Sequence, residues 1–330
     1  MAFRRRVFSI LSAVGAVALL AALFLLIDID TGTLFSEVLA FDPGSFLLVT
    51  LLTLAIMFCS QERWQILQAH YPSSSLFSRR STFMYTCVGA SLAQIIPPHI
   101  STGLARSMGS WFEKRSRPLH SIAFTLIEQL FDLLISLVIL VSCLLFLSGQ
   151  IAFSSWIGLT VISTAVLLIP LVVISAKTPY IGAFIVDRVG TVIRLLPQQI
   201  VDTLPALSLP TGKVTAKLYG LSILRFIALV ARATVISYSA LAAFNWWEIS
   251  TTVPVMQLSG LIPITPGSLG ITEWAWSSVI SALDIPLATA AQFALLHRIV
   301  ALAAQLIVTL FSIIVFTRLK QITSTTAADD

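Results

Sequence analysis

The sequence predicts an all-α membrane protein, a polytopic bundle of about six spanning helices and two re-entrant hairpins. Three observations support this fold class. The 330-residue chain is 57% hydrophobic and only 11% charged, which is too apolar for a water-soluble core. Several apolar stretches reach the roughly 20 residues that a spanning helix needs. These stretches, such as LLISLVILVSCLLFL at 133–147, are uniformly apolar, whereas barrel strands would alternate.

The placement of charge predicts which helix ends face the cytoplasm. Arg4, Arg5 and Arg6 precede the first apolar run and put the N-terminus inside. We interpret residues 1–27 as a retained helix and not as a cleaved signal, because the apolar run is long and no small-residue cleavage site follows it. The next loop carries only acidic charges and is expected outside. A second span at about 44–60 returns the chain to the cytoplasm.

Residues 83–118 break this alternation. A complete crossing would leave Arg106 and the basic residues after it outside, against the positive-inside rule. A re-entrant hairpin that enters from the cytoplasm and turns at Pro97 and Pro98 avoids this conflict. The alternative is one short span followed by an amphipathic loop.

A second interruption lies near the end of the chain. Residues 249–284 contain two short apolar limbs around Pro263, Pro266, Gly267 and Gly270, which predicts a second hairpin, entering from the outside. Full spans are expected before and after it, at about 119–147, 153–175, 218–243 and 287–317.

This arrangement predicts an inverted repeat, because each half contains span, span, hairpin and span. We expect one integral membrane domain with a first repeat at 1–150, an inverted second repeat at 151–317 and a short cytoplasmic tail at 318–330. The hairpins can be aligned so that Pro97 matches Pro263 and Gly103 nearly matches Gly270. Interrupted segments in corresponding positions of two halves indicate a transport site near the middle of the membrane.

Ionisable side chains inside the membrane are costly, so each is a functional candidate. Arg232 is one of them, whereas Arg225 and Arg63 lie nearer the inner ends of their segments and are expected to act as interfacial anchors. The residues predicted to bind or move a substrate are Arg106, Glu128, Asp132, Pro266, Gly267, Gly270, Glu273 and Arg298. The alternative is a buried ion-pair network that only locks the hairpins together, formed by Arg106, Glu128, Glu273 and Arg298.

Two local patterns suggest how these residues act. Glu128 and Asp132 are four residues apart on one helix face, which is unfavourable unless a cation such as an arginine lies between them or one is protonated. Helices that restart after Ser101 or Thr102, and after Ser268, would direct free N–H groups into the membrane and favour phosphate. Glu273 would repel phosphate, so we expect it to hold Arg106 or Arg298, or to carry a proton.

Other site classes lack support in the sequence. Cys59, Cys87 and Cys143 stand singly in apolar runs without metal-ligand spacing, so we expect them to pack as small apolar side chains. We expect no metal, no cofactor and no catalytic residue. The basic residues follow the expected cytoplasmic loops, which does not indicate nucleic-acid binding.

The segments PPHISTGLARS, IEQLFDLLI, IPITPGSLGITEWAW and ALLHRIVAL resemble the lysylphosphatidylglycerol synthase transmembrane-region family of flippase-like membrane proteins. The family's late pattern, P-x-x-P-G-x-L-G-x-x-E with a downstream arginine, is matched by Pro263, Pro266, Gly267, Leu269, Gly270, Glu273 and Arg298. Two departures leave open a different headgroup at the first-half site. Gln129 stands where the family usually has arginine, and Gln94 replaces a common asparagine.

The resemblance implies translocation of an anionic lipid or lipid-linked substrate across a bacterial inner membrane, in support of envelope lipid or glycan synthesis. An envelope biosynthetic enzyme is an expected partner class. One alternative is a non-transporting accessory subunit of a membrane glycosyltransferase or lipid synthase. Another is a membrane-embedded transferase with Glu128 or Asp132 as its base.

Overall fold

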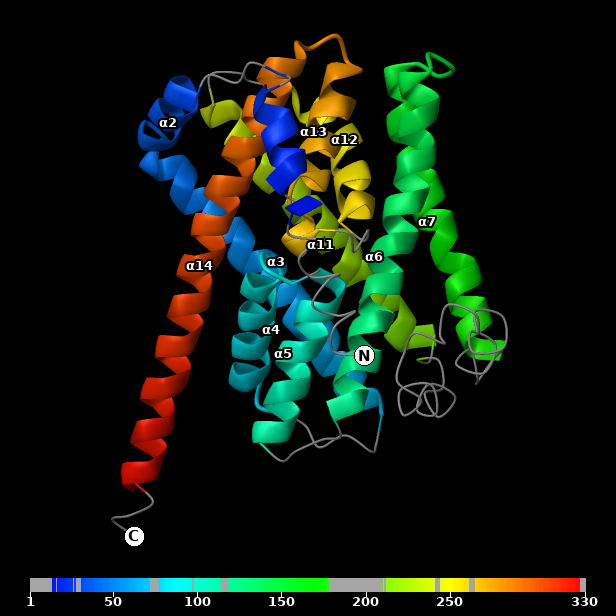
Figure 1. Cartoon of the computed structure of the whole chain (residues 1–330). Coiled ribbons are helices and arrows are strands. Elements are labelled where there is room, and N and C mark those ends of the chain that lie inside the picture. The colour runs from blue at the N-terminus through cyan, green and yellow to red at the C-terminus, as the bar shows by residue number, and fades with distance from the viewer. Residues whose placement is uncertain are drawn as a thin grey trace.

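Five long helices form the body of the protein. The structure is a computed structural model that describes residues 14–15, 17–25, 27, 31–71, 77–96, 98–113, 118–177, 210, 212–240, 244–260 and 265–326, and these residues form helices and turns without any strand (Figure 1). The helices long and apolar enough to cross a membrane are α3 (Pro43–His70), α6 (Pro118–Leu147), α7 (Phe153–Lys177), α11 (Gly212–Ser239) and α14 (Leu287–Thr326). The predicted polytopic, all-α fold class is therefore confirmed.

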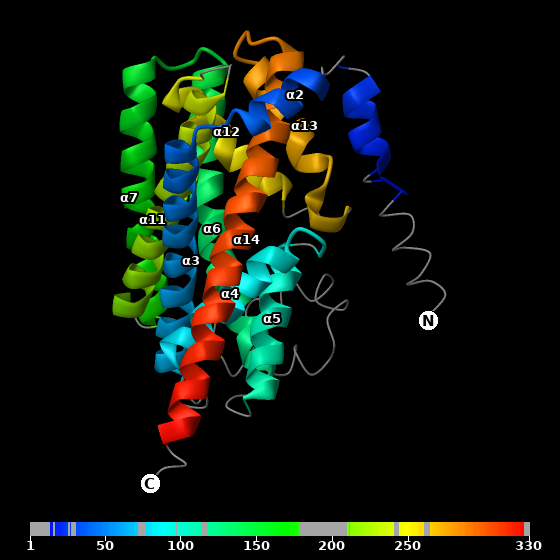
Figure 2. The same ribbon diagram turned by 90° about the vertical axis from the view of Figure 1, so that its left-hand side faces the viewer.

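Two pairs of shorter helices form the hairpins. The first hairpin consists of α4 (Arg79–Leu92) and α5 (Pro98–Phe112), and the second of α12 (Trp246–Ser259) and α13 (Ile271–Ser281). The longest of the four, α5, has 15 residues and measures about 23 Å, less than the roughly 30 Å of a bilayer core. Figure 2 shows the first hairpin at the end of the bundle that holds the C-terminus and the second at the opposite end. Residues 83–118 therefore contain most of two helices that pack on each other, and their re-entrant placement in the membrane stays a prediction.

The two hairpin tips touch in the middle of the protein. A Cβ atom built on Gly267 would lie 2.1 Å from the carbonyl oxygen of Gln94, which is closer than any side chain could approach. Gly267 also has a φ of 56°, in the region that favours glycine. This residue therefore has to be glycine for the tips to meet as they do.

Small residues allow the limbs of the first hairpin to pack closely. A Cβ on Gly89 of α4 would lie 2.8 Å from the Cα atom of Thr102 on α5, so a larger residue here would force one helix to shift. A Cβ on Gly109 of α5 would lie 2.6 Å from the ring of Tyr85. Close backbone approach at small residues is the usual way in which helices associate inside a membrane.

The first predicted span, residues 1–27, lies largely outside the described residues, as do Arg4, Arg5 and Arg6. Residues 17–25 are helical. They pack beside the second hairpin, because the indole N–H of Trp274 donates to the carbonyl oxygen of Leu19 at 3.1 Å. A Cβ on Gly270 would lie 2.5 Å from the Cβ of Leu19.

Several helix boundaries differ from the prediction. A short helix, α2 (Thr31–Leu39), occupies part of the expected acidic loop and buries Leu34. Helix α5 begins at Pro98, ahead of the restart expected after Ser101, and α14 continues beyond 317 through the expected tail to Thr326. Pro97 and Pro263 lie outside the described residues.

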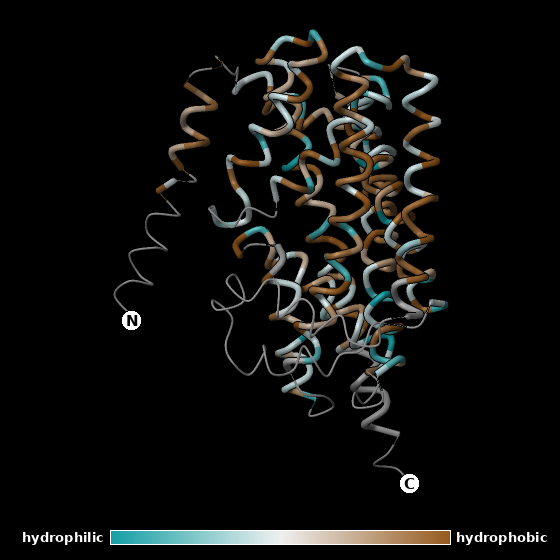
Figure 3. The backbone as a smooth tube through the Cα atoms, turned by 90° about the vertical axis from the view of Figure 1, so that its right-hand side faces the viewer, coloured by the Kyte–Doolittle hydropathy of each residue, from teal (hydrophilic) through white to brown (hydrophobic). Residues whose placement is uncertain are grey.

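The helices bury the three cysteines and expose apolar side chains outward. Cys59, Cys87 and Cys143 are buried free thiols, as predicted. Helix α7 is the least buried of the spans, and Figure 3 shows the apolar character of the long helices. The exposed Val161, Ile162 and Ile169 of α7 are suited to contact with lipid chains.

The two ends of the bundle differ in side-chain chemistry. Helix α4 starts with Arg79 and Arg80 at the end that holds the C-terminus (Figure 2), which is the end expected to face the cytoplasm. At the opposite end, an aromatic cluster joins α6, α7 and α12, formed by Phe146, Phe153, Trp156, Trp246 and Trp247. Aromatic side chains concentrate at membrane–water interfaces.

Candidate functional site

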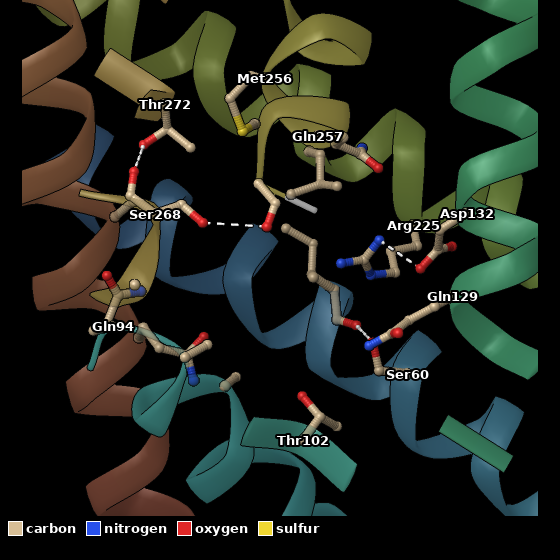
Figure 4. A pocket seen from close by; sticks show the side chains of 18 of the residues that line it. Ser60, Gln94, Thr102, Gln129, Asp132, Arg225, Met256, Gln257, Ser268 and Thr272 are labelled. Atoms are coloured by element: carbon tan, nitrogen blue, oxygen red, sulfur yellow. Dashed lines mark hydrogen bonds and ion pairs between the residues drawn. The ribbon is translucent and has the colours of Figure 1, made fainter. Parts of the chain in front are cut away.

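A cavity of ≈ 360 Å³ lies where the hairpin tips meet (Figure 4). Both hairpins contribute to its wall, together with α3, α6, α11 and α14. Its volume is within the range of small-molecule sites and is large enough for a lipid headgroup. The segments that line it come from both predicted halves of the chain.

Arg106 anchors the first hairpin to the wall of this cavity. Its guanidinium donates to Glu128 Oε1 of α6 at 2.8 Å and to the carbonyl oxygen of Ser60 at 3.1 Å. The group lies 4.7 Å above the ring of Trp64, within cation–π range. Because the side chain is 0% exposed and has these partners, its contacts with the protein fix the position of α5 against α6 and α3.

Two carboxylates on α6 share arginines from two other helices. Arg63 of α3 lies 2.6 Å from Asp132 Oδ1 and 3.6 Å from Glu128 Oε2, so it bridges the two acids, which is the first of the two alternatives expected from the sequence. Arg225 of α11 binds the other oxygen of Asp132 at 3.1 Å. Arg63 is 3% and Arg225 is 24% exposed, so the interpretation of both as interfacial anchors is wrong. Arg63 and Arg225 each lie inside a helix that continues well past them, so their side chains reach the cavity wall.

Glu273 closes the start of α13 and pairs with Arg298. Its Oε2 accepts the Gly270 N–H at 2.6 Å, and Oε1 accepts from the Arg298 guanidinium of α14. Arg298 also donates to the carbonyl oxygen of Gly267 at 2.8 Å, which ties the tip of the second hairpin to α14. The partner of Glu273 is thus Arg298 and not Arg106.

This carboxylate also changes the expectation of a phosphate site after Ser268. The amide hydrogen of Gly270 is occupied by Glu273, and that of Ser268 donates to the carbonyl oxygen of Thr265 at 3.1 Å. A negative charge already lies at the positive end of α13. The helix start is therefore neutralised by the protein itself.

The acidic and basic residues form two clusters instead of one network. Arg106 and Glu128 pair within the first half, and Glu273 and Arg298 pair within the second. No ion pair between described residues joins the two clusters. A single lock through both hairpins, as considered from the sequence, is therefore wrong in that form.

Arg232 differs from the other arginines of the cavity. It lies seven residues after Arg225 on α11, so both side chains face the same side of the helix. Its guanidinium donates to Thr53 Oγ1 at a long 3.5 Å. In the described part of the chain, no carboxylate lies within ion-pairing distance of it. Overall the wall holds five arginines and three carboxylates, an excess of two positive charges.

Uncharged amides complete the wall. Gln94, Gln129 and Gln257 come from three different elements and all line the cavity (Figure 4). Gln257 Oε1 accepts from Ser136 at 3.2 Å, whereas its Nε2 has no hydrogen-bond partner among the described residues. Amides both donate and accept, so they can bind hydroxyl groups as well as phosphate oxygens.

Not all predicted site residues reach the cavity. Pro266 starts the turn at Pro266–Ser268 and Gly270, with a φ of 81°, is the residue before α13, so both shape the tip of the second hairpin. The predicted residues that line the cavity are Arg106, Glu128, Asp132, Gly267, Glu273 and Arg298. Sequence reasoning missed Gln257 and misjudged Arg63 and Arg225. The spacing of Arg225 and Arg232 within an apolar helix was the sequence signal that places both side chains on one helix face and could have assigned Arg225 to the cavity.

Comparisons with known proteins identify one family. The model of the family described as "Lysylphosphatidylglycerol synthase TM region" matches residues 10–309. A comparison with curated proteins finds no match.

Proposed function

The chain belongs to the lysylphosphatidylglycerol synthase TM region family, and from this we propose that it moves an anionic lipid or a lipid-linked substrate between the leaflets of a membrane. It is an integral membrane protein of the lipid-synthesis or flippase-like kind. We further propose that the membrane is a bacterial inner membrane, with both termini on the cytoplasmic side. The basic residues at the start of α4 support this orientation.

The observation that carries the proposal is the cationic cavity between the hairpin tips. Charged groups are costly at this depth, and proteins retain them where a polar substrate passes. Five arginines against three carboxylates leave the cavity electropositive, and an anionic headgroup would balance that excess. Lipid tails can remain in the surrounding bilayer while the headgroup crosses.

The hairpins supply a means of alternating access. Each is tied to the long helix that follows it, the first by Arg106 and Glu128 and the second by Glu273 and Arg298. These two units meet at the contact between the hairpin tips, where Gly267 packs against Gln94. Rocking of one unit against the other would open the cavity to alternate faces, as in transporters built from interrupted helices.

The carboxylates are poorly placed for a transferase mechanism. Glu128 and Asp132 are each held by two arginines, so their oxygens are already engaged in ion pairs with the protein. An accessory role through an envelope biosynthetic enzyme remains the alternative. The accessory role predicts that the protein still functions when a charged residue of the cavity is removed, whereas translocation predicts that it does not.

The test is lipid exchange between leaflets in proteoliposomes. Fluorescent phosphatidylglycerol would be placed in both leaflets and bleached from outside with dithionite, with protein-free vesicles as the baseline. Wild type should accelerate exchange, and Arg232→Gln should slow it while leaving the ion pairs intact. Arg80→Gln, which removes an exposed charge at the base of the first hairpin, is the matched control. If exchange by wild type equals the baseline, the translocation proposal fails. If wild type exchanges lipid and Arg232→Gln does so equally, the charge of the cavity is not needed for the exchange.

A further inference from the structure

The acids of the cavity wall are already engaged. Glu128 is held by Arg106 and Arg63, Asp132 by Arg63 and Arg225. Glu273 is held by Arg298 and by the amide of Gly270. A cationic headgroup entering here would find no carboxylate without an arginine among the described residues of the wall. It would also meet an excess of positive charge.

We propose that the cavity binds a phosphodiester headgroup with a neutral, hydroxyl-bearing substituent, a polyol or a sugar, and that it rejects zwitterionic and aminoacylated headgroups. This inference rests on the proposed function, since it assigns the substrate class of the same site. It also separates this chain from the aminoacylated lipid in the family's name. Arg232 is the residue that we assign to the phosphate.

Arg232 fits a phosphate for three reasons. It lines the cavity, it lacks a carboxylate partner in the described part of the chain, and its one hydrogen bond, to Thr53, is long. A guanidinium offers several donors in a planar fork that matches phosphate oxygens. Arg225 lies about 10 Å away along the same helix face and shares Asp132 with Arg63. The pair therefore offers one uncommitted cation and one partly committed cation.

The remainder of the wall fits a neutral substituent. Gln94, Gln129 and Gln257 line it together with hydroxyls of Ser60 and Thr102 (Figure 4). These groups can exchange hydrogen bonds with the hydroxyls of a polyol or sugar without requiring a charge. The unpartnered Nε2 of Gln257 is a donor that such a hydroxyl or a phosphate oxygen would satisfy.

Binding, measured separately from exchange, tests this inference. The probes are phosphatidylglycerol, phosphatidylcholine and lysyl-phosphatidylglycerol with identical acyl chains, titrated against the purified full chain in neutral detergent. Phosphatidylglycerol should bind about tenfold more tightly than either of the other two, because all three carry the phosphodiester but only choline and lysine bring a cation into a wall with an excess of positive charge. Arg232→Gln should remove most of that advantage, because every probe loses the phosphate contact but only the two cationic headgroups gain from the lower positive charge of the wall. Arg80→Gln should retain the full preference.

Each outcome separates the inference from the proposed function. Equal affinities for the three lipids, tighter binding of lysyl-phosphatidylglycerol, or an unaltered preference in Arg232→Gln would overturn the inference, even if wild type exchanges lipid. A preference for phosphatidylglycerol without exchange would support the inference and overturn translocation. Arg232→Lys keeps the charge and should retain part of the preference. It thus distinguishes a lost phosphate contact from misfolding.

A soluble headgroup identifies where the affinity comes from. Glycerophosphoglycerol carries the same phosphodiester and polyol without acyl chains. It should displace bound phosphatidylglycerol from wild type at millimolar concentration and lose this ability with Arg232→Gln. Displacement that is the same for both proteins, or none for either, would place recognition in the acyl chains and contradict a headgroup site at Arg232.

Discussion

Gly267 and Gln94 meet at the centre of the protein with no room for a side chain between them. The hypothetical Cβ of Gly267 lies 2.1 Å from the carbonyl oxygen of Gln94 and the backbone of Gly267 has a positive φ. The two residues come from hairpins that enter from opposite ends of the bundle (Figure 2). The contact is therefore the point at which the tips of the two hairpins pack against each other.

Gly267→Ala should destabilise the protein by about 2–5 kcal/mol. The left-handed backbone contributes about 1–2 kcal/mol, and overpacking against Gln94 adds about 1–3 kcal/mol. The free energy of unfolding, measured by titration with denaturing detergent, reports the change. Gly149→Ala is the matched control, because Gly149 has a φ of 70° and nothing near its hypothetical Cβ. An equal cost for both substitutions would show that the contact between the tips contributes nothing.

The pair of Glu273 and Arg298 should respond unequally to its two substitutions. Arg298→Ala leaves Glu273, which is 2% exposed, as a buried charge, and should cost about 3–5 kcal/mol of stability. Glu273→Gln keeps an oxygen that can accept the Gly270 N–H, and Arg298 is 20% exposed and can be hydrated, so about 1–2 kcal/mol is expected. A double-mutant cycle should give a coupling of about 1–3 kcal/mol. Additive effects would mean that the pair does not interact.

Arg63→Gln should be more damaging than Arg225→Gln. Arg63 is 3% exposed and binds Asp132, Glu128 and Ser222. Its loss leaves two acids on one face of α6 with less compensation, at a cost of about 3–5 kcal/mol. Arg225 is 24% exposed and binds only Asp132 among the described residues, which Arg63 still holds. A loss of about 1–2 kcal/mol is expected there. Thermal unfolding of the two variants would give the order, and a reversed order would contradict the assigned contacts.

The hairpins could be predicted from the sequence because their signals are local. Pro266, Gly267 and Gly270 interrupt an apolar segment, and the basic residues after Arg106 cannot be placed outside. The bridging of Glu128 and Asp132 by an arginine was one of two alternatives that the sequence offered, the other being protonation of one acid. The identity of that arginine was not, because it comes from another helix.

The partners in the cavity depend on packing that spacing does not encode. Arg106 and Glu273 each lie on the second helix of a hairpin, and each pairs with the long helix that follows it, so Arg106 is not the partner of Glu273. Arg63 was misplaced because α3 continues to His70, which puts Arg63 inside a helix and not at its end. The meeting of Gln94 with Gly267 joins residues far apart in the chain, and no local pattern records it.

The assignment of 83–118 and 249–284 as hairpins predicts a specific labelling pattern. In a variant with Cys59, Cys87 and Cys143 replaced, single cysteines would be introduced at the two bases of each hairpin. The sites are Arg80 and Phe112 for the first and Asn245 and Asp284 for the second, all exposed. A membrane-impermeant maleimide applied to oriented vesicles should label the first two from one side only and the last two from the other side only. Labelling of Arg80→Cys and Phe112→Cys from opposite sides would mean that the first hairpin crosses the membrane, and the cavity would then lose the wall supplied by its tip.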